Sequence, residues 1–352
     1  MKRNNWPETL LAWFDGSRRA LPWREDHPRN PYHVWVSEIM LQQTRTETVK
    51  GYFQRWMEQF PTIRDLAQAP EEQVLRAWQG LGYYSRARNL HKAARQVMAE
   101  WGGQLPRERK ALGSLAGIGA YTVGAILSMA FGEKIPAVDG NLLRVLSRLY
   151  GVEEDISGTQ GKKTITALAE EAIPGARPGD FNEALMDLGA EVCIPRHPRC
   201  EACPLTAFCQ AWKEGKTEIL PVKKPKAPQK ELAAACGLVV REGRYLFHKR
   251  PAKGMLASMW EFPMVLEPGA EKARSSLVKL LETEAGPAVW QHRHVFTHQI
   301  WNMTAYVMER AEVRGEEWSW FSPEEWEKVP LAGPHAKLAD WLKKTVDRNE
   351  KV

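Results

Sequence analysis

Apolar residues recur at every third or fourth position through most of the first 215 residues of the chain. This spacing is typical of helices that bury one face. The clearest stretches are residues 66–78, 85–101, 122–131, 142–150 and 162–172. Glycine and proline interrupt the pattern between them, at 60–61, 80–82, 102–103, 174–175 and 178–179. The pattern therefore predicts an all-α domain over residues 1–215.

The hydrophobic pattern changes after a segment rich in proline and lysine, which cannot form part of a buried core. Residues 220–230 contain three prolines and four lysines, so we expect an extended linker over residues 216–230. Short β-like runs follow at 232–240 and 245–248, and the turn at 241–244 predicts a hairpin. A helical stretch at 272–283 and strands at 289–296 and 300–308 complete the pattern. These elements predict an α+β domain over residues 231–352.

One segment of the helical domain combines an anion-binding motif with an isolated carboxylate. Gly117 and Gly119 precede an apolar helical run over residues 121–131. Glycines allow a tight turn and a close approach of backbone amides to a ligand, and a helix N-terminus binds anions such as a DNA phosphate. Asp139 follows, between a strand-like run at 135–138 and a helical run at 141–150. The alternative role for Asp139 is that of a helix N-cap.

A second carboxylate, Glu38, lies within the apolar helical stretch of residues 32–44. A carboxylate in such surroundings is either ion-paired or kept protonated by desolvation, and a surface glutamate is the alternative interpretation. Cleavage of a glycosidic bond needs one protonated acid at the leaving group and one ionised carboxylate beneath an oxocarbenium-like centre. Glu38 and Asp139 together fit this pair of roles.

Four closely spaced cysteines predict one metal centre. They follow the pattern C-x6-C-x2-C-x5-C and are Cys193, Cys200, Cys203 and Cys209. No apolar run follows the first five residues, so we expect no secretion signal and no disulfides. The spacing alone permits zinc or a [4Fe–4S] cluster, with zinc the simpler choice. Cys236 lies in an apolar strand and is expected in the core.

Composition constrains the function only broadly. The net charge of +6 fits a polyanionic partner without proving one. No run of about 18 apolar residues is present, which excludes a membrane span. The simplest expectation is a cytoplasmic protein.

Together, these motifs resemble the adenine DNA glycosylase (MutY) family of the helix-hairpin-helix superfamily. The shared segments keep the family's order across residues 20–210, and they are 21–24, 37–44, 80–89, 115–122, 138–141, 181–185 and the four cysteines. The C-terminal part is similar to the family's Nudix-like domain at 250–251, 256, 260–263 and 294–298. The resemblance implies a helix-hairpin-helix near residues 110–131, and it favours a [4Fe–4S] cluster at the cysteines over zinc.

The resemblance implies a function in base-excision repair. The enzyme would remove adenine mispaired with 8-oxoguanine or guanine in duplex DNA, after flipping the nucleotide out of the stack. It would act as a monomer, in the cytoplasm of a bacterial type of cell and associated with the nucleoid.

The resemblance also implies roles for individual residues. Glu38 would protonate adenine N7, and Asp139 would stabilise the cationic sugar or form a transient adduct with it. Tyr121, Asn141 and Glu183 would support these two carboxylates. The residues that would contact DNA are Arg24, Leu41, Gln43, Thr44, Tyr83, Gly117, Gly119, Phe296, Thr297 and His298.

Tyr121 separates this family from its closest mechanistic alternative. The related endonuclease III family has a lysine at this position, which attacks the sugar as an amine and then cuts the strand. A phenol cannot form an imine, so we expect base release that leaves the abasic site intact. A second alternative is a DNA-binding protein that has lost its chemistry, and the presence of both Glu38 and Asp139 argues against it.

The Nudix-like domain lacks most of the carboxylates that would hold Mg²⁺ for nucleotide hydrolysis. If Gly286 is the late glycine of the Nudix motif, its acidic positions fall on Leu280, Thr283 and Glu284, and its arginine position falls on Lys279. We therefore predict no nucleotide hydrolysis. The domain would instead read the oxidised guanine through residues 296–298, for which the alternative is an ordinary turn with packed aromatic rings.

Overall fold

The structure is a computed structural model that describes residues 5–26, 28–224 and 228–349. The chain forms two compact units, which we call the helical unit (residues 1–68 and 89–225) and the sheet unit (residues 69–88 and 226–352). Residues 1–4, at the end where no secretion signal is expected, and residues 225–227 of the predicted linker lie outside the described residues. In the part of the chain that is described, every helix is too short or too polar to cross a membrane.

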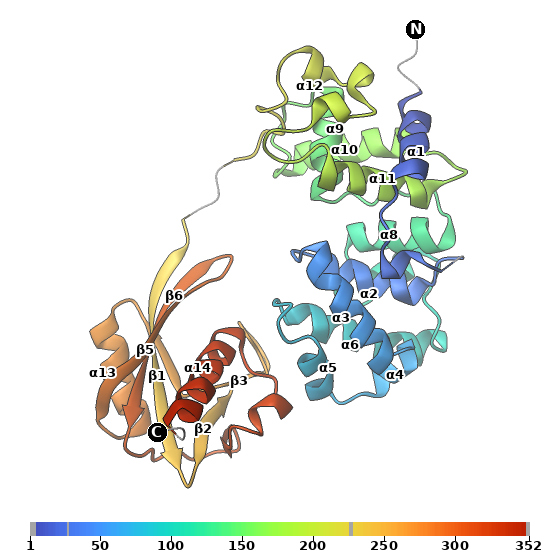
Figure 1. The fold of residues 1–352 in the computed structure, drawn as a ribbon. Coiled ribbons are helices and arrows are strands. Elements are labelled where there is room, and N and C mark those ends of the chain that lie inside the picture. Colours follow the sequence, from blue (N-terminus) through green and yellow to red (C-terminus); the bar gives the residue numbers. More distant parts are fainter. Residues whose placement is uncertain (1–4, 27, 225–227, 350–352) are drawn as a thin grey trace. The chain divides into compact units, whose positions relative to one another are not determined.

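The helical unit contains helices joined by turns and irregular segments (Figure 1). Its α-helices are α1 (Trp6–Ser17), α2 (Pro31–Leu41), α3 (Thr46–Gln59), α4 (Ile63–Gln68), α6 (Ser85–Trp101) from residue 89 onward, α7 (Arg109–Gly113), α8 (Ala120–Phe131), α9 (Gly140–Tyr150), α10 (Thr159–Ala172), α11 (Pro178–Glu191) and α12 (Gln210–Lys213). Short 3-10 helices are η1 (Pro22–Arg24), η2 (Cys200–Ala202) and η3 (Thr206–Phe208). The predicted helices at 85–101, 122–131, 142–150 and 162–172 are confirmed.

Three local predictions are wrong. The single helix expected over residues 66–78 is split, because Pro70 has extended backbone and α5 (Glu71–Ala77) begins only after it. The break expected at 178–179 is absent, since Pro178 occupies the first turn of α11, where no backbone donor is required. Residues 135–138 form no strand: Ala137 N–H donates to the Asn182 side chain (2.9 Å) instead of to a neighbouring strand.

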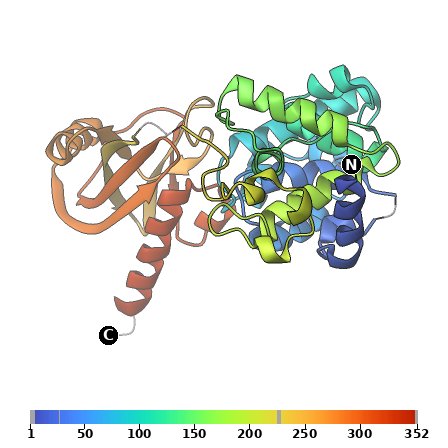
Figure 2. The same cartoon turned by 90° about the horizontal axis from the view of Figure 1, so that it is seen from above.

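Segments from the two ends of the helical unit pack against each other. Helix α1 lies beside α11, and the rings of Trp6 and Phe181 are 5.5 Å apart. In Figure 2 this pair is visible as the dark-blue helix beside the yellow-green one. The apolar core that they share also includes Leu10, Leu146 and Leu185, all fully buried. The core therefore joins residues more than 160 positions apart in the chain.

The sheet unit is built on a mixed sheet with the strand order β3-β2-β1-β6-β5. β4 also pairs with β1, and β7 pairs with β2. The strands are β1 (Lys230–Arg241), β2 (Arg244–Lys249), β3 (Trp260–Glu261), β4 (Met264–Glu267), β5 (Ala285–Val295), β6 (Gln299–Met308) and β7 (Trp318–Phe321). The predicted hairpin is confirmed by the antiparallel pairing of Val240 with Tyr245, whereas β1 and β6 run parallel.

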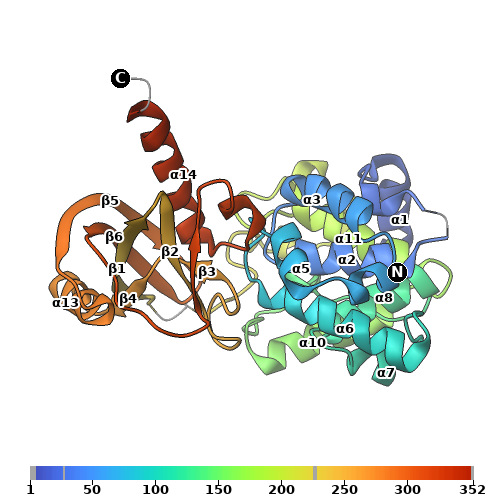
Figure 3. The ribbon, with the colours of Figure 1, turned by 90° about the horizontal axis from the view of Figure 1, so that it is seen from below.

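Helices cover both faces of this sheet. Along β1, Ala234, Cys236 and Leu238 face one core, which includes α14 (Gly333–Asn349). Ala235 and Val239 face the other core, which includes α13 (Ala270–Leu281). Figure 3 shows these two helices on opposite sides of the sheet. The expected core position of Cys236 is confirmed, because its side chain is fully buried. The sequence analysis anticipated α13 but not α14.

Two observations refine the domain limits expected from the sequence. Leu220, in the predicted linker, is buried and its carbonyl accepts from Arg148 Nε (2.8 Å), so the first part of residues 216–230 packs on the helical unit. Residues 69–88, expected in the helical domain, group with the sheet unit. The packing of Leu220 and the grouping of residues 69–88 both depend on contacts between residues distant in sequence. The hydrophobic pattern along the chain does not reveal such contacts.

Candidate active site

The predicted anion-binding hairpin consists of α7, residues 114–119 and α8. Gly117 has φ of 76°, and a Cβ at this position would lie 2.7 Å from Asn89 Cβ. Glycine is therefore required at 117 on both grounds. Gly119 has ordinary extended backbone (φ −94°, ψ 177°), and a Cβ there would meet only open space. The tight turn thus depends on Gly117, while Gly119 leaves the N-terminus of α8 open to an approaching anion.

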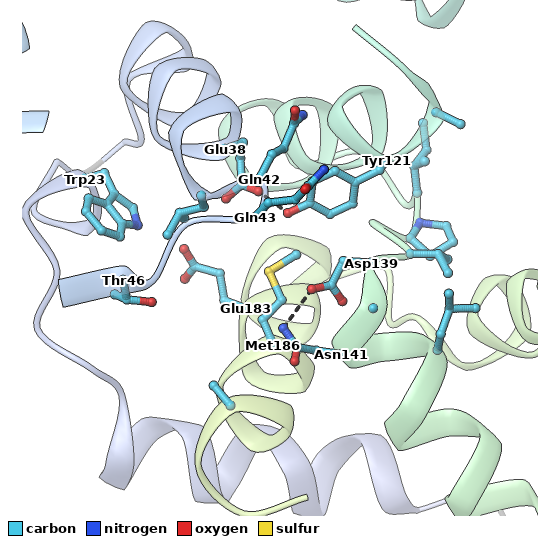
Figure 4. A pocket seen from close by; sticks show the side chains of 18 of the residues that line it. Trp23, Glu38, Gln42, Gln43, Thr46, Tyr121, Asp139, Asn141, Glu183 and Met186 are labelled. Carbon is cyan, nitrogen blue, oxygen red and sulfur yellow. Dashed lines mark hydrogen bonds between the residues drawn. The ribbon is translucent and has the colours of Figure 1, made fainter. Parts of the chain in front are cut away.

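A cavity of about 810 Å³ lies in the helical unit and gathers all five predicted catalytic residues and four of the predicted DNA contacts (Figure 4). The predicted residues that line the cavity are Arg24, Glu38, Leu41, Gln43, Thr44, Tyr121, Asp139, Asn141 and Glu183. The lining also includes residues that the sequence analysis missed, namely Arg19, Trp23, Thr46 and Met186. Trp23 belongs to the recognised motif at 21–24, whereas Arg19, Thr46 and Met186 lie outside the recognised motifs and predicted helices. Only the fold shows that these four residues face the cavity. The hairpin glycines, Tyr83 and residues 296–298 lie outside the cavity lining.

Glu38, on α2, is only 5% exposed. Its carboxyl group accepts a hydrogen bond from the hydroxyl of Tyr121 on α8. Burial raises the pKa of Glu38 to about 7, and the negative charges of Asp139 and Glu183 add to this effect. The Tyr121 hydrogen bond and the charge of Arg24 act in the opposite direction. A carboxyl group with this pKa is partly protonated near neutral pH, which suits it to proton transfer.

Asp139 both caps a helix and lines the cavity. It is the N-cap of α9, where its Oδ1 accepts from the backbone N–H of Leu142 (2.7 Å). Its Oδ2 accepts from Asn141 Nδ2 (2.8 Å), the contact drawn in Figure 4. Burial raises the pKa of Asp139 above its usual value, while these hydrogen bonds act to lower it. The capping interpretation is confirmed, and it does not exclude a role in the cavity.

Asn141 is held in a fixed orientation. Its Oδ1 accepts from Arg144 Nη2 (2.9 Å), so its amide nitrogen is directed to Asp139. Arg144 also donates to the carbonyl oxygens of Gly189 (2.6 Å) and Cys193 (2.7 Å). The donor that reaches Asp139 is therefore part of a connected polar network.

Glu183, on α11, is a buried carboxylate surrounded by guanidinium groups. Its Oε1 accepts from Arg24 Nε (3.1 Å) and its Oε2 from Arg29 Nη2 (2.8 Å). Arg24 and Glu183 are 6% and 4% exposed. Both are among the predicted site residues, whereas Asp187, which also binds Arg24, is not. Its position four residues after Glu183, one turn along a helix, was the signal that could have found it.

Gln43, at the rim of the cavity, has left-handed backbone. Its φ is 61° and its side chain is exposed, directly after the end of α2. A non-glycine residue in this region is strained, and such residues cluster at functional sites. The strain is consistent with the DNA contact expected for this residue.

In the sheet unit, Tyr83 is 46% exposed and also has left-handed backbone (φ 49°). Its hydroxyl forms a hydrogen bond with Thr297, whose position between β5 and β6 belongs to the same unit. The neighbouring Phe296 packs edge-on against Trp301, with 4.7 Å between ring centroids, whereas Thr297 and His298 are exposed. The loop therefore has one packed aromatic ring and two polar side chains available to a ligand.

The four cysteines of the predicted metal centre are free and line one apolar cavity. Burial raises the pKa of the Cys203 thiol to about 11, and the nearby Cys193 and Cys209 add to this effect. Arg148 Nη1 donates to Cys193 Sγ (3.4 Å). Within the described ranges, no three histidine, cysteine or acidic residues are already arranged to hold a metal ion. Four thiols lining one cavity are nevertheless the donor set of a thiolate-bound zinc or iron–sulphur centre.

Comparison with known proteins places both parts of the chain. Residues 36–174 match the family model of HhH-GPD superfamily base excision DNA repair proteins, and residues 234–341 match that of the NUDIX domain. The chain is 38% identical to an adenine DNA glycosylase of Homo sapiens, over 82% of this chain and 64% of that protein. It is 34% identical to one of Buchnera aphidicola subsp. Schizaphis graminum, over 73% of this chain and 74% of that protein. The chain thus spans less than two thirds of the human relative's length.

Solved structures resemble the helical part of the chain. A thermostable thymine-DNA glycosylase aligns with a TM-score of 0.54 and 32% identity, over 60% of this chain and 97% of that one. A trapped endonuclease III–DNA covalent intermediate aligns with a TM-score of 0.52 over 61% of this chain and 99% of that one. Its 23% identity shows the fold alone. The predicted fold, a helix-hairpin-helix domain followed by a Nudix-like α+β domain, is confirmed.

Proposed function

Because the chain belongs to the adenine DNA glycosylase family, we propose that it hydrolyses the N-glycosidic bond of adenine mispaired with 8-oxoguanine or guanine in duplex DNA. The observation that carries this proposal is the pairing of Glu38, whose pKa is raised to about 7, with Asp139 in one cavity. The protein would act as a monomer on nucleoid DNA in a bacterial cytoplasm.

The first step is extrusion of the adenosine into the cavity, because the bond to be cleaved cannot be reached inside the duplex. The cavity of about 810 Å³ has room for a flipped nucleotide. The open N-terminus of α8 behind Gly117 would hold a backbone phosphate. Leu41, Gln43 and Thr44, on one rim, would contact the duplex from which the base has left.

The chemical step then uses the two carboxyl groups in different protonation states. Glu38 transfers its proton to adenine N7, so that the electron pair of the breaking C1′–N9 bond leaves on a neutral base. Asp139, ionised and hydrogen-bonded to Leu142 N–H and Asn141, faces the positive charge that develops on the sugar. Water adds at C1′ and loses a proton, which completes hydrolysis. Arg24 and Glu183 form part of the wall that would surround the base.

The presence of tyrosine at position 121 argues against strand cleavage after base release. Its phenol donates to Glu38 and offers no amine that could form an imine with the abasic sugar. The enzyme would therefore release the base and leave the strand intact.

The experiment that tests the proposal is single-turnover adenine release from an 8-oxoguanine:A duplex. We expect strand breaks only after alkali treatment and no covalent adduct after borohydride. Strand breaks without alkali would instead show a lyase of the endonuclease III type. Tight duplex binding without any adenine release would show the non-catalytic alternative. A duplex with cytosine opposite 8-oxoguanine is the substrate control.

The pH dependence of adenine release provides a separate prediction. If the protonated form of Glu38 is active, the rate falls as pH rises through about 7. The Tyr121 hydrogen bond lowers the pKa of Glu38, so Tyr121→Phe should raise this pKa and move the fall in rate to higher pH. The measurement is the single-turnover rate between about pH 5 and pH 9. The control is Tyr150→Phe, since Tyr150 binds Trp6 outside the cavity lining. An unmoved or lower midpoint contradicts the assignment.

We propose that the Nudix-like domain recognises the oxidised guanine and hydrolyses no nucleotide. The support for this role is the exposure of Thr297 and His298, whose side chains can make polar contacts with a base. Threonine retains the hydroxyl donor where many family members have serine, and its methyl group adds bulk.

We propose that Cys193, Cys200, Cys203 and Cys209 hold a [4Fe–4S] cluster. Such a cluster would order residues 193–209 in a structural or DNA-binding role, and its four cysteine ligands would leave no open position for hydrolysis. The purified protein should be brown, with broad visible absorption and bound iron, and Cys200→Ser should lose both. Cys236→Ser is the control, because Cys236 lies in the core of the sheet unit. A colourless protein that contains zinc contradicts the proposal.

A further inference from the structure

Asp187 is a fully buried carboxylate on α11 that the chemistry described above does not use. Its Oδ2 accepts from Arg24 Nη1 (2.7 Å) and its Oδ1 from Arg24 Nη2 (3.0 Å). Arg19 Nε donates to the same Oδ1 (2.8 Å). Two arginines that line the cavity are thus held by one carboxylate that is absent from the cavity lining.

The contacts of Arg24 fix its orientation. Its two terminal nitrogens bind Asp187 in the bidentate geometry that is most specific for arginine, and its Nε binds Glu183. All three nitrogens of the guanidinium therefore have carboxylate partners, and the group is only 6% exposed. If Asp187 were uncharged, Arg24 would keep only the carboxylate of Glu183, which it shares with Arg29.

The charges around Glu183 and Asp187 are unequal. Four guanidinium groups, those of Arg18, Arg19, Arg24 and Arg29, lie within ion-pair distance of these two carboxylates. The burial of charge requires such pairing, so removal of one carboxylate leaves positive charge uncompensated. Arg24 carries this charge nearest to the reaction, since it acts directly on Glu38.

We propose that Asp187 is a positioning residue, which holds Arg24 against Glu183 in the cavity wall and offsets its positive charge beside the reacting carboxyl group. The inference rests on the proposed function. Its consequence is that Glu38 keeps its proton to higher pH than it would beside an uncompensated arginine. The other groups that act on Glu38 are Tyr121 from α8, Asp139 at the start of α9 and Glu183 from α11.

The test is the pH profile of single-turnover adenine release by Asp187→Asn. Asparagine keeps the size of the side chain but removes its charge, so the fall in rate should move to lower pH by about one unit. Such a shift corresponds to about a tenfold loss above the midpoint. Below the midpoint Glu38 is protonated in both proteins, and a further loss of up to about 10²-fold would report displacement of Arg24. A purely structural role of Asp187 would lower the rate equally at every pH.

Two further variants sharpen this test. Asp155→Asn removes a carboxylate that accepts from Ser157 N–H (2.8 Å) outside the cavity lining, and it should leave the profile unchanged. Asp187→Glu restores the charge and should return the midpoint towards that of the wild type. If Asp187→Asn does not fold, the double variant Arg24→Gln/Asp187→Asn removes both members of the pair, and its midpoint should equal that of Arg24→Gln alone.

An unshifted midpoint in Asp187→Asn, together with active wild-type protein, overturns the inference. So does a further shift when Asp187→Asn is added to Arg24→Gln. Failure of the proposed function gives a different result, because the wild-type protein itself would then release no adenine.

Discussion

Replacement of Glu38 by glutamine is expected to lower the single-turnover rate of adenine release by about 10²- to 10⁴-fold. Glutamine has nearly the same shape and can still accept a hydrogen bond from Tyr121, but its amide has no acidic proton to transfer to adenine N7. The measurement is the rate at saturating enzyme on an 8-oxoguanine:A duplex. Glu38→Gln should also lose the fall in rate that the wild type shows near pH 7.

The loss should not result from unfolding. The pKa of Glu38 is raised from 4.5 to about 7 by burial, so its ionisation destabilises the folded protein as pH rises through this window. Glutamine avoids this ionisation, and Glu38→Gln should therefore have an equal or higher Tm than the wild type at about pH 8. Glu47→Gln, an exposed glutamate on α3, is the matched control. A normal rate for Glu38→Gln would exclude Glu38 as the general acid.

Asp139→Asn is expected to lower the rate by about 10²- to 10³-fold through loss of negative charge beneath the sugar. Asparagine is as good an N-cap as aspartate, and its oxygen can still accept from Leu142 N–H, so α9 should keep its stability. The two roles of Asp139 are thereby separated in one variant. A loss well beyond 10³-fold would instead indicate that Asp139 attacks the sugar and forms a covalent adduct.

Asp139→Ala provides the comparison for this second prediction. It removes both the charge and the cap, and it should lower the free energy of unfolding by about 1 kcal/mol relative to Asp139→Asn. Thermal unfolding of the two variants, measured beside their rates, distinguishes chemistry from stability. If Asp139→Asn and the wild type release adenine at equal rates, Asp139 has no role in the reaction and serves only as a helix cap.

The sequence was sufficient where structure depends on neighbours along the chain. Helix α6 has the predicted limits, and the β1–β2 hairpin forms around the predicted turn, because local periodicity and glycine placement determine both. Pro70 and Pro178 show the limit of this approach. Each proline was visible in the sequence, but whether it ends a helix or begins one depends on its exact place in the turn.

The candidate site was predictable where its residues belong to motifs. Glu38, Tyr121 and Asp139 are far apart in the chain, and the resemblance placed them together before the cavity was described. Asp187 lies outside these motifs, so the resemblance did not place it in the site, and its spacing from Glu183 was the only hint. In sequence, a buried aspartate on a helix cannot be distinguished from an exposed one. Asp187 can be buried because Arg19 and Arg24, from the N-terminal part of the chain, pair with its charge.

The packing of α1 on α11 determines when the site can exist during synthesis. Trp6 packs against Phe181, and Arg24 binds Glu183 and Asp187. All three partners lie on α11, which is synthesised long after Trp6 and Arg24. Such long-range contacts form only after the intervening residues have left the ribosome. A chain interrupted before α11 would contain Glu38 but would lack Glu183 and Asp187, and with them part of the proposed wall around the base. Incomplete products should be inactive towards DNA rather than partly active.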